Sequence, residues 1–208
     1  MANSASTDSP TPRAHERKRA RERQALIQAG FRYLGQQESQ RGFVMDVLAD
    51  AGLSTRAFYR HFASRDELIV AMLRVESERV TAWLTGVVTE AKRGAEALHD
   101  YVYAFLSVAY EPRRAARVRA LSSPDARSVW GRHDIANEDA RDKRAILHEV
   151  FVRGISDGTL RGAQPVEDAF ALHALASAYV DARVTGADVI SFGGAVEHTV
   201  NLFSRSRS

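Results

Sequence analysis

The spacing of apolar residues is the feature of this sequence that most restricts its fold. From residue 26 onward, apolar side chains recur every three or four positions, which is the period of one helix face. Sustained alternation of apolar and polar residues, which marks a half-buried strand, is absent from the sequence. The pattern therefore predicts an all-α fold of about nine helices. Beyond residue 91, helical patterns cover roughly residues 95–110, 113–121, 124–130, 137–155, 166–184 and 194–204.

Composition restricts the kinds of site that the chain can carry. Its 208 residues are 45% apolar, which is enough to bury a core. The sequence has no cysteine, which excludes disulfides, thiolate zinc sites and cysteine nucleophiles and fits a reducing cytoplasm. No apolar run approaches the roughly 20 residues that span a bilayer, and the first residues lack the apolar core of a secretory signal. We expect a cytoplasmic protein with no membrane partner.

Charge is distributed unevenly along the chain, and the uneven distribution separates a basic first third from the remainder. Residues 11–65 hold eleven Lys or Arg against five Asp or Glu, whereas residues 66–208 hold eighteen against twenty. Concentrated positive charge is typical of a nucleic-acid surface, because phosphates attract Lys and Arg and release counterions when these bind. A solvated basic stretch without a partner is the alternative on charge alone. We expect a disordered tail over residues 1–12, a basic domain over 13–66 and a second helical domain over 67–208.

Residues 44–62 contain two short helical patterns joined by a tight turn. The first pattern ends at Gly52, a residue suited to the left-handed backbone that closes a helix. Ser54 then offers an N-cap, and Ser64 with Glu67 forms a capping box that opens a long helix. Two helices joined in this way have the geometry of a helix-turn-helix, whose second helix enters the major groove of DNA.

Phe58 and Phe62 lie one turn apart on the second of these helices, so we expect both to be buried against the neighbouring helices. That burial turns outward four residues of the kinds that contact DNA, namely Thr55, Arg56, Tyr59 and Arg60. In the basic arm before them, Arg17 and Arg21 are candidates for phosphate or minor-groove contacts, and we expect the arm to become ordered only on DNA.

Residues 26–68 resemble, without a gap, the N-terminal module of the TetR family of bacterial repressors. The resemblance rests on Leu26-Ile27, Ala29, Val47, Ala51-Gly52-Leu53-Ser54, Phe58-Tyr59-Arg60-His61-Phe62, Ser64 and Leu68. It implies that Ser54 starts the recognition helix, and that Tyr59, His61 and Arg65 contact phosphates. It also implies that Thr55, Arg56 and Ala57 face base edges. For Tyr59 and His61 the alternative is that they cap a local core with their polar ends in water. Phe43 and Val44, at the start of the preceding helix, belong to the same candidate interface.

Three positions depart from the family pattern. Glu38 stands where Gly is usual, Phe43 where Thr is usual, and Leu48 where Ala is common. The loss of Thr at position 43 removes an N-cap and a phosphate contact, so the helix there is expected to start differently. Arg65 in place of the usual Lys keeps the charge.

The resemblance weakens in residues 67–208 but implies the same architecture there. The last two helices are expected to pair with a second copy through small residues at 169, 174 and 176–178 and an apolar stripe of Val196, Val200 and Phe203, although an intramolecular core would look much the same. The arginines of residues 111–120 invite an acidic ligand, although such a run is usually a solvated helix face. Seven side chains are candidates for lining a ligand pocket, with core packing the alternative for each: Trp83, Tyr101, Phe105, Trp130, His148, Phe151 and His173.

Together these features predict a repressor that a small molecule releases from a palindromic DNA operator. An architectural DNA-binding protein without ligand control is the alternative. An enzyme is disfavoured because the sequence has no Gly-x-Ser-x-Gly elbow, phosphate-binding glycine loop or His-Glu-x-x-His pair. His133-Asp134 and His148-Glu149 are adjacent in sequence and point to different sides of a helix, which argues against a metal site. We expect no cofactor.

Overall fold

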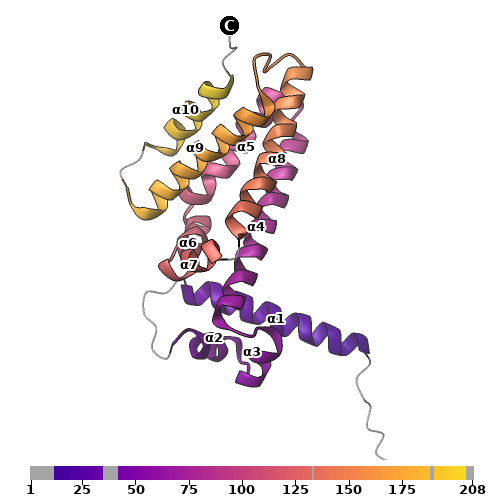
Figure 1. The fold of residues 1–208 in the computed structure, drawn as a ribbon, viewed down its shortest axis with the longest axis vertical. Coiled ribbons are helices and arrows are strands. Elements are labelled where there is room, and N and C mark those ends of the chain that lie inside the picture. Colours follow the sequence, from indigo (N-terminus) through magenta and orange to yellow (C-terminus); the bar gives the residue numbers. More distant parts are fainter. Residues whose placement is uncertain (1–11, 35–41, 133, 188–189, 205–208) are drawn as a thin grey trace, which may run out of the picture. The chain divides into compact units, whose positions relative to one another are not determined.

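A computed structural model describes residues 12–34, 42–132, 134–187 and 190–204. These residues form helices and no strand, so the all-α prediction is confirmed (Figure 1). The helices are α1 (Pro12–Leu34), α2 (Phe43–Ala51), α3 (Thr55–His61), α4 (Arg65–Glu90), α5 (Gly94–Tyr110), α6 (Pro112–Leu121), α7 (Pro124–Arg132), α8 (Ile135–Ser156), α9 (Pro165–Thr185) and α10 (Phe192–Ser204). None of the described helices is both long and apolar enough to cross a membrane.

The chain divides into two compact units, Met1–Ile69 and Val70–Ser208. The first unit holds α1, α2, α3 and the first turn of α4, and the second holds the remainder of α4 and α5 to α10. The division falls a few residues after the boundary that the sequence predicts. Pro12 begins α1, whereas the rest of the expected tail, together with Glu38 and His133, lies outside the described residues.

The turn between α2 and α3 is formed by two helix caps that the sequence predicts, at Gly52 and Ser54. Gly52 adopts the left-handed conformation, with φ 63°, and the Leu53 N–H donates to the Leu48 carbonyl at 3.1 Å, which closes the end of α2. Ser54 has an extended backbone, and its hydroxyl accepts from the Ala57 N–H at 3.3 Å. These caps stop one helix and start the next within three residues.

The start of α4 is fixed by the predicted capping box. The Ser64 hydroxyl accepts from the Glu67 N–H at 3.1 Å, and the Glu67 carboxylate accepts from the Ala63 N–H at 2.5 Å. The carboxylate thus reaches one residue further back than the usual partner in this motif. Because the chain turns at both ends of α3, the seven-residue helix is held between two fixed points.

In the second unit, α5 is the central helix. Its side chains are buried almost all round, and it packs against α6, α8, α9 and α10, while α8 and α9 lie side by side (Figure 1). Within one chain, the stripe on α10 also helps to cover the core. Val196 is buried, and Val200 and Phe203 are partly buried against the same core. This is the intramolecular packing that the sequence allowed as an alternative, and pairing with a second copy stays a prediction.

Two glycines let α5 and α8 approach each other at backbone distance. A Cβ placed on Gly94 would lie 2.2 Å from the Gly154 Cα, a separation that no side chain can adopt. The contact is reinforced by the Asp157 carboxylate, which accepts from the Gly94 N–H at 2.7 Å. The Arg153 guanidinium also donates to the carbonyls of Val88 and Ala91, near the end of α4.

We predict that Gly94→Ala lowers the free energy of unfolding by about 1–3 kcal/mol, because the added methyl group meets backbone that cannot move aside. Gly86→Ala is the matched control, since Gly86 is an exposed position within α4 and a Cβ there would meet nothing within 4 Å. The control should be unchanged or slightly more stable. Urea denaturation followed by circular dichroism measures both, and equal stability of the two variants would refute the close packing.

Candidate nucleic-acid interface and ligand pocket

The orientation of α3 is set by its two phenylalanines. Phe58 and Phe62 are 0% and 2% exposed, and their ring centroids lie 5.9 Å apart. On the opposite side of the helix, Thr55 and Arg56 are exposed, and Tyr59 is 60% exposed. The predicted outward face is therefore present, and it begins directly after the Ser54 cap.

Ala57 does not belong to that outward face. Its side chain is buried, because it shares the inward side of α3 with Phe58. The expectation that Ala57 faces base edges is therefore wrong for its side chain. The exposed residues at the start of α3 are Thr55 and Arg56, with Tyr59 one turn on.

Arg60 and His61 share a partner on α1. The Glu22 carboxylate accepts from the Arg60 guanidinium at 2.5 Å, and the same oxygen lies 3.0 Å from His61 Nε2. The His61 side chain is only 4% exposed. The family resemblance implies a phosphate contact for this ring, but a ring buried in this way is not available for one. The hydrogen bonds from His61 and then from Arg60 lower the pKa of Glu22. Glu22 thus ties the end of α3 to α1.

The first residues of α2 act by packing. Phe43 is buried and meets Tyr33 edge to face, with ring centroids 4.9 Å apart. The Arg65 guanidinium lies 4.9 Å from the centre of the Phe43 ring. The N-cap of α2 is Gly42, with φ 93° and no side-chain cap, so the helix does start differently where threonine is missing. The Phe43 side chain is thus a buried platform for Arg65 and does not point outward, and Val44 beside it is half-buried.

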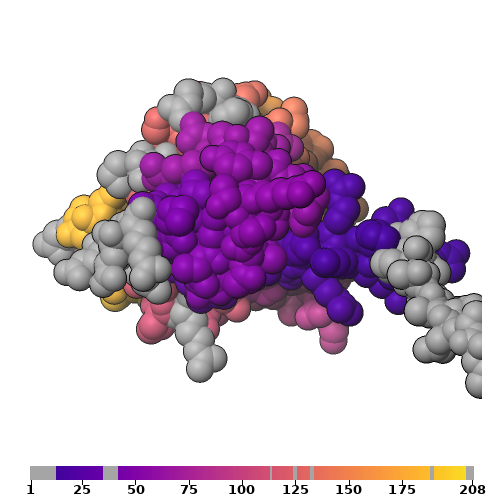
Figure 2. All heavy atoms as spheres, turned by 90° about the horizontal axis from the view of Figure 1, so that it is seen from below, coloured from indigo at the N-terminus to yellow at the C-terminus, as the bar shows by residue number. Residues whose placement is uncertain are grey.

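The basic arm is helical. Arg13, Arg17, Lys18 and Arg21 are exposed on α1 and, with Glu22 and Leu53, line a surface depression. Because α1 begins at Pro12, the arm continues that helix as an exposed basic start, and its ordering on DNA stays a prediction. Figure 2 shows this side of the first unit, with α1 in indigo beside α2 and α3 in violet. Cationic side chains and the outward face of α3 therefore belong to one compact unit.

The second unit contains a partly open pocket of about 330 Å³ lined by residues of α4, α5, α6, α7, α8 and α9. Three of the predicted ligand candidates line it, namely Phe105, Trp130 and His173. The other four do not: Tyr101 and Phe151 are core residues, Trp83 stacks on Arg114, and His148 lies beside Glu149 on the surface.

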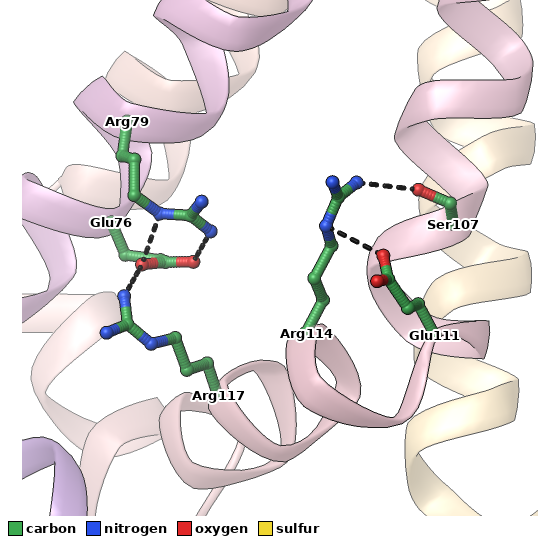
Figure 3. A network of polar contacts seen from close by, with 6 residues as sticks. All are labelled: Glu76, Arg79, Ser107, Glu111, Arg114 and Arg117. Carbon is green, nitrogen blue, oxygen red and sulfur yellow. Dashed lines mark hydrogen bonds and ion pairs between the residues drawn. The ribbon is translucent and has the colours of Figure 1, made fainter.

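Charged residues that the sequence did not single out complete the pocket. Glu76 lines it and accepts from Arg79 at 2.5 Å and 3.1 Å and from Arg117 at 3.2 Å (Figure 3). Asp139 also lines it and accepts from Ser77 and Lys143. Burial and the nearby Lys143 lower the pKa of His173 to about 4, so its ring is neutral at physiological pH.

Two arginines of residues 111–120, Arg114 and Arg117, bind the protein's own oxygens. Besides Arg117 on Glu76, the Arg114 guanidinium donates to the Ser107 hydroxyl at 3.1 Å and pairs with Glu111 at 2.9 Å (Figure 3). The sequence allowed these arginines either to bind an acidic ligand or to form a solvated helix face. Neither prediction describes Arg114 and Arg117, because each already has a carboxylate partner. The pairing of Arg117 with Glu76 joins residues 41 positions apart, which no local pattern reveals.

We predict that the stability supplied by the Glu22 pairing is present above the ordinary carboxyl pKa and is lost as the pH falls through the lowered pKa of the folded protein. In Arg60→Ala, the NMR titration midpoint of the Glu22 carboxyl carbon should move upward, because one of the two lowering hydrogen bonds is gone. Arg56→Ala removes an arginine of the same helix that does not touch Glu22 and should leave the midpoint in place. An unchanged midpoint in Arg60→Ala would contradict the pairing.

Comparison with known proteins finds likeness in structure and not in sequence. No protein-family model matches the chain, and no curated protein matches it significantly. Among solved structures, a TetR-family transcriptional regulator from Pectobacterium atrosepticum is 19% identical with a TM-score of 0.67, over 93% of both chains. NalD of Pseudomonas aeruginosa, the secondary repressor of the MexAB-OprM multidrug efflux pump, is 18% identical with a TM-score of 0.62, over 88% of this chain and 96% of its own.

FadR of Bacillus subtilis, a transcriptional regulator solved with stearoyl-CoA, is 12% identical with a TM-score of 0.70, over 89% of this chain and 99% of its own. These neighbours are regulators rather than enzymes. The resemblance inferred from residues 26–68 is thus matched by a likeness over both units. The chain has the fold of the TetR-family transcriptional regulators.

Proposed function

We propose that the protein is a sequence-specific DNA-binding repressor that a small molecule releases from its operator. The observation that carries this proposal is the burial of Phe58 and Phe62, which leaves Thr55, Arg56 and Tyr59 exposed on a capped helix. The basic face of α1 in the same unit supplies the charge that a phosphate backbone requires.

The exposed residues divide into two roles on a duplex. Arg56 reads guanine through two hydrogen bonds, and Thr55 offers a hydroxyl and a methyl group to neighbouring base edges. Tyr59 donates to a phosphate, and Arg65, held over Phe43, neutralises another. The exposed cations of α1, including Arg17 and Arg21, add contacts that do not depend on base sequence.

A palindromic operator requires a two-fold dimer, and α9 offers a surface for one. Val166 and Phe170 are 67% and 60% exposed, and Ala174 and Ala178 are exposed further along the same helix. A second copy would cover these apolar side chains, and the alanines allow helices to approach closely. On α10, Leu202 is exposed and extends the apolar surface available to a partner.

The proposed release of DNA follows from which helices line the pocket. Leu73, Glu76 and Val80 come from α4, the helix that begins directly after the DNA-reading motif, and Val180 comes from α9. A ligand that binds one arrangement of these helices better than another shifts the population toward that arrangement. If the favoured arrangement spaces the two reading helices wrongly for successive grooves, DNA is released.

The experiment that tests the function is a competition gel shift at fixed salt. The promoter region flanking the protein's own gene should compete for binding far better than a random duplex of equal length. Equal competition by the two duplexes would remove the repressor and leave the architectural alternative.

Substitution separates the proposed roles. Arg56→Ala should cost roughly 1–3 kcal/mol of operator affinity and relax base preference, whereas Arg65→Ala should weaken all sequences alike and flatten the salt dependence by about one unit. Arg141→Ala, an exposed arginine of the second unit, is the control for loss of charge alone. Fluorescence anisotropy over a range of salt concentrations measures all three. Unchanged operator affinity in Arg56→Ala would show that α3 is misoriented in this account.

A further inference from the structure

The wall of the pocket in the second unit is mostly apolar. Side chains that touch its volume of about 330 Å³ include Leu73, Val80, Phe105, Val108, Val118, Leu121 and Val180. This volume lies at the small end of the range of about 300–1,000 Å³ that ligand pockets occupy. The occupant is therefore compact, and most of its surface is apolar.

The two less exposed carboxylates of the pocket, buried Glu76 and partly buried Asp139, already have cationic partners. Glu76 holds Arg79 and Arg117, and Asp139 holds Lys143, whose side chain is only 6% exposed. An anionic ligand that paired with Lys143 would leave Asp139 buried beside a second negative charge. A cationic ligand that paired with Glu76 would face two guanidinium groups. Since a half-buried charge without a partner is costly, the pocket disfavours ligands of either sign.

The third carboxylate, Asp181, does not change this balance. Asp181 also lines the pocket, but it is an exposed residue of α9, so water solvates its charge. Its attraction for a bound cation is correspondingly screened.

Two residues that line the pocket each carry a polar atom that lacks a hydrogen-bond partner among the described residues. These atoms are Trp130 Nε1 and His173 Nδ1, and both are buried from water. An indole N–H can only donate, so the partner that Trp130 lacks is an acceptor. The neutral His173 ring, held edge to face against Phe105, can present either a donor or an acceptor at Nδ1. A buried donor without a partner costs free energy that a ligand acceptor would recover.

We infer that this pocket takes a compact, uncharged and largely apolar molecule whose carbonyl-type oxygen accepts a hydrogen bond from the indole N–H of Trp130. The inference rests on the proposed function in that the molecule would be the releasing ligand. The chemical class of the ligand and its hydrogen bond with Trp130 concern the second unit alone.

The test follows the indole N–H signals of the full-length protein by ¹⁵N NMR. The chain has two tryptophans, so Trp83→Phe assigns the Trp130 signal and also serves as a control outside the pocket. The probes are four single-ring molecules of similar size: acetophenone is neutral with a carbonyl, benzoate is anionic, benzamidine is cationic, and ethylbenzene is neutral without an acceptor. Acetophenone should shift the Trp130 signal saturably and bind at least roughly tenfold more tightly than benzoate or benzamidine. Absence of a saturable shift with acetophenone, or equal affinity for a charged probe, would overturn the inference.

Trp130→Phe keeps an aromatic ring but removes the donor. In calorimetric titrations it should lose affinity for acetophenone roughly tenfold while its affinity for ethylbenzene stays the same. Equal loss for both probes would show that the ring only fills space. No readout here involves DNA, so a protein that binds its operator but fails these titrations refutes the ligand class alone, whereas failed operator binding refutes the regulator.

Discussion

The burial of Phe58 and Phe62 is the interaction on which the first unit depends. A seven-residue helix is too short to be stable alone, so α3 exists because two aromatic side chains one turn apart are removed from water and because Ser54 caps its start. The same burial decides which residues point outward. The chemistry available to a duplex, that of Thr55, Arg56 and Tyr59, is therefore a consequence of packing on the opposite side of the helix.

Carboxylates organise the charge of both units. In the first unit, Glu22 accepts from Arg60 and His61, so these two basic side chains hold α3 against α1. In the second, Glu76 accepts from Arg79 and Arg117 beside the pocket. The number of basic residues in the first third of the chain thus overstates how many cations are free to meet phosphates. In the arginine-rich α6, Arg114 and Arg117 likewise bind the protein's own oxygens.

The parts of the fold that depend on neighbouring residues could be predicted from the sequence. The Gly52 and Ser54 caps, the capping box at Ser64 and the buried phenylalanines are settled within a few positions of each other, and the structure confirms them. The errors at Phe43 and His61 arose because their surroundings come from α1 and α4, far away in sequence. The pocket could be predicted only in part for the same reason. Some of its aromatic residues are candidates from the sequence, but the pairing of Asp139 with Ser77 joins positions 62 apart.

The most direct test of the outward face uses the absence of cysteine from the chain. Single-cysteine variants at neighbouring positions, Arg56→Cys and Ala57→Cys, are treated with a thiol reagent with and without duplex DNA at low salt. The account predicts rapid labelling at position 56 that the duplex suppresses, and slow labelling at position 57 in both conditions. Equal labelling rates at the two positions, or a rate at position 56 that DNA leaves unchanged, would contradict it.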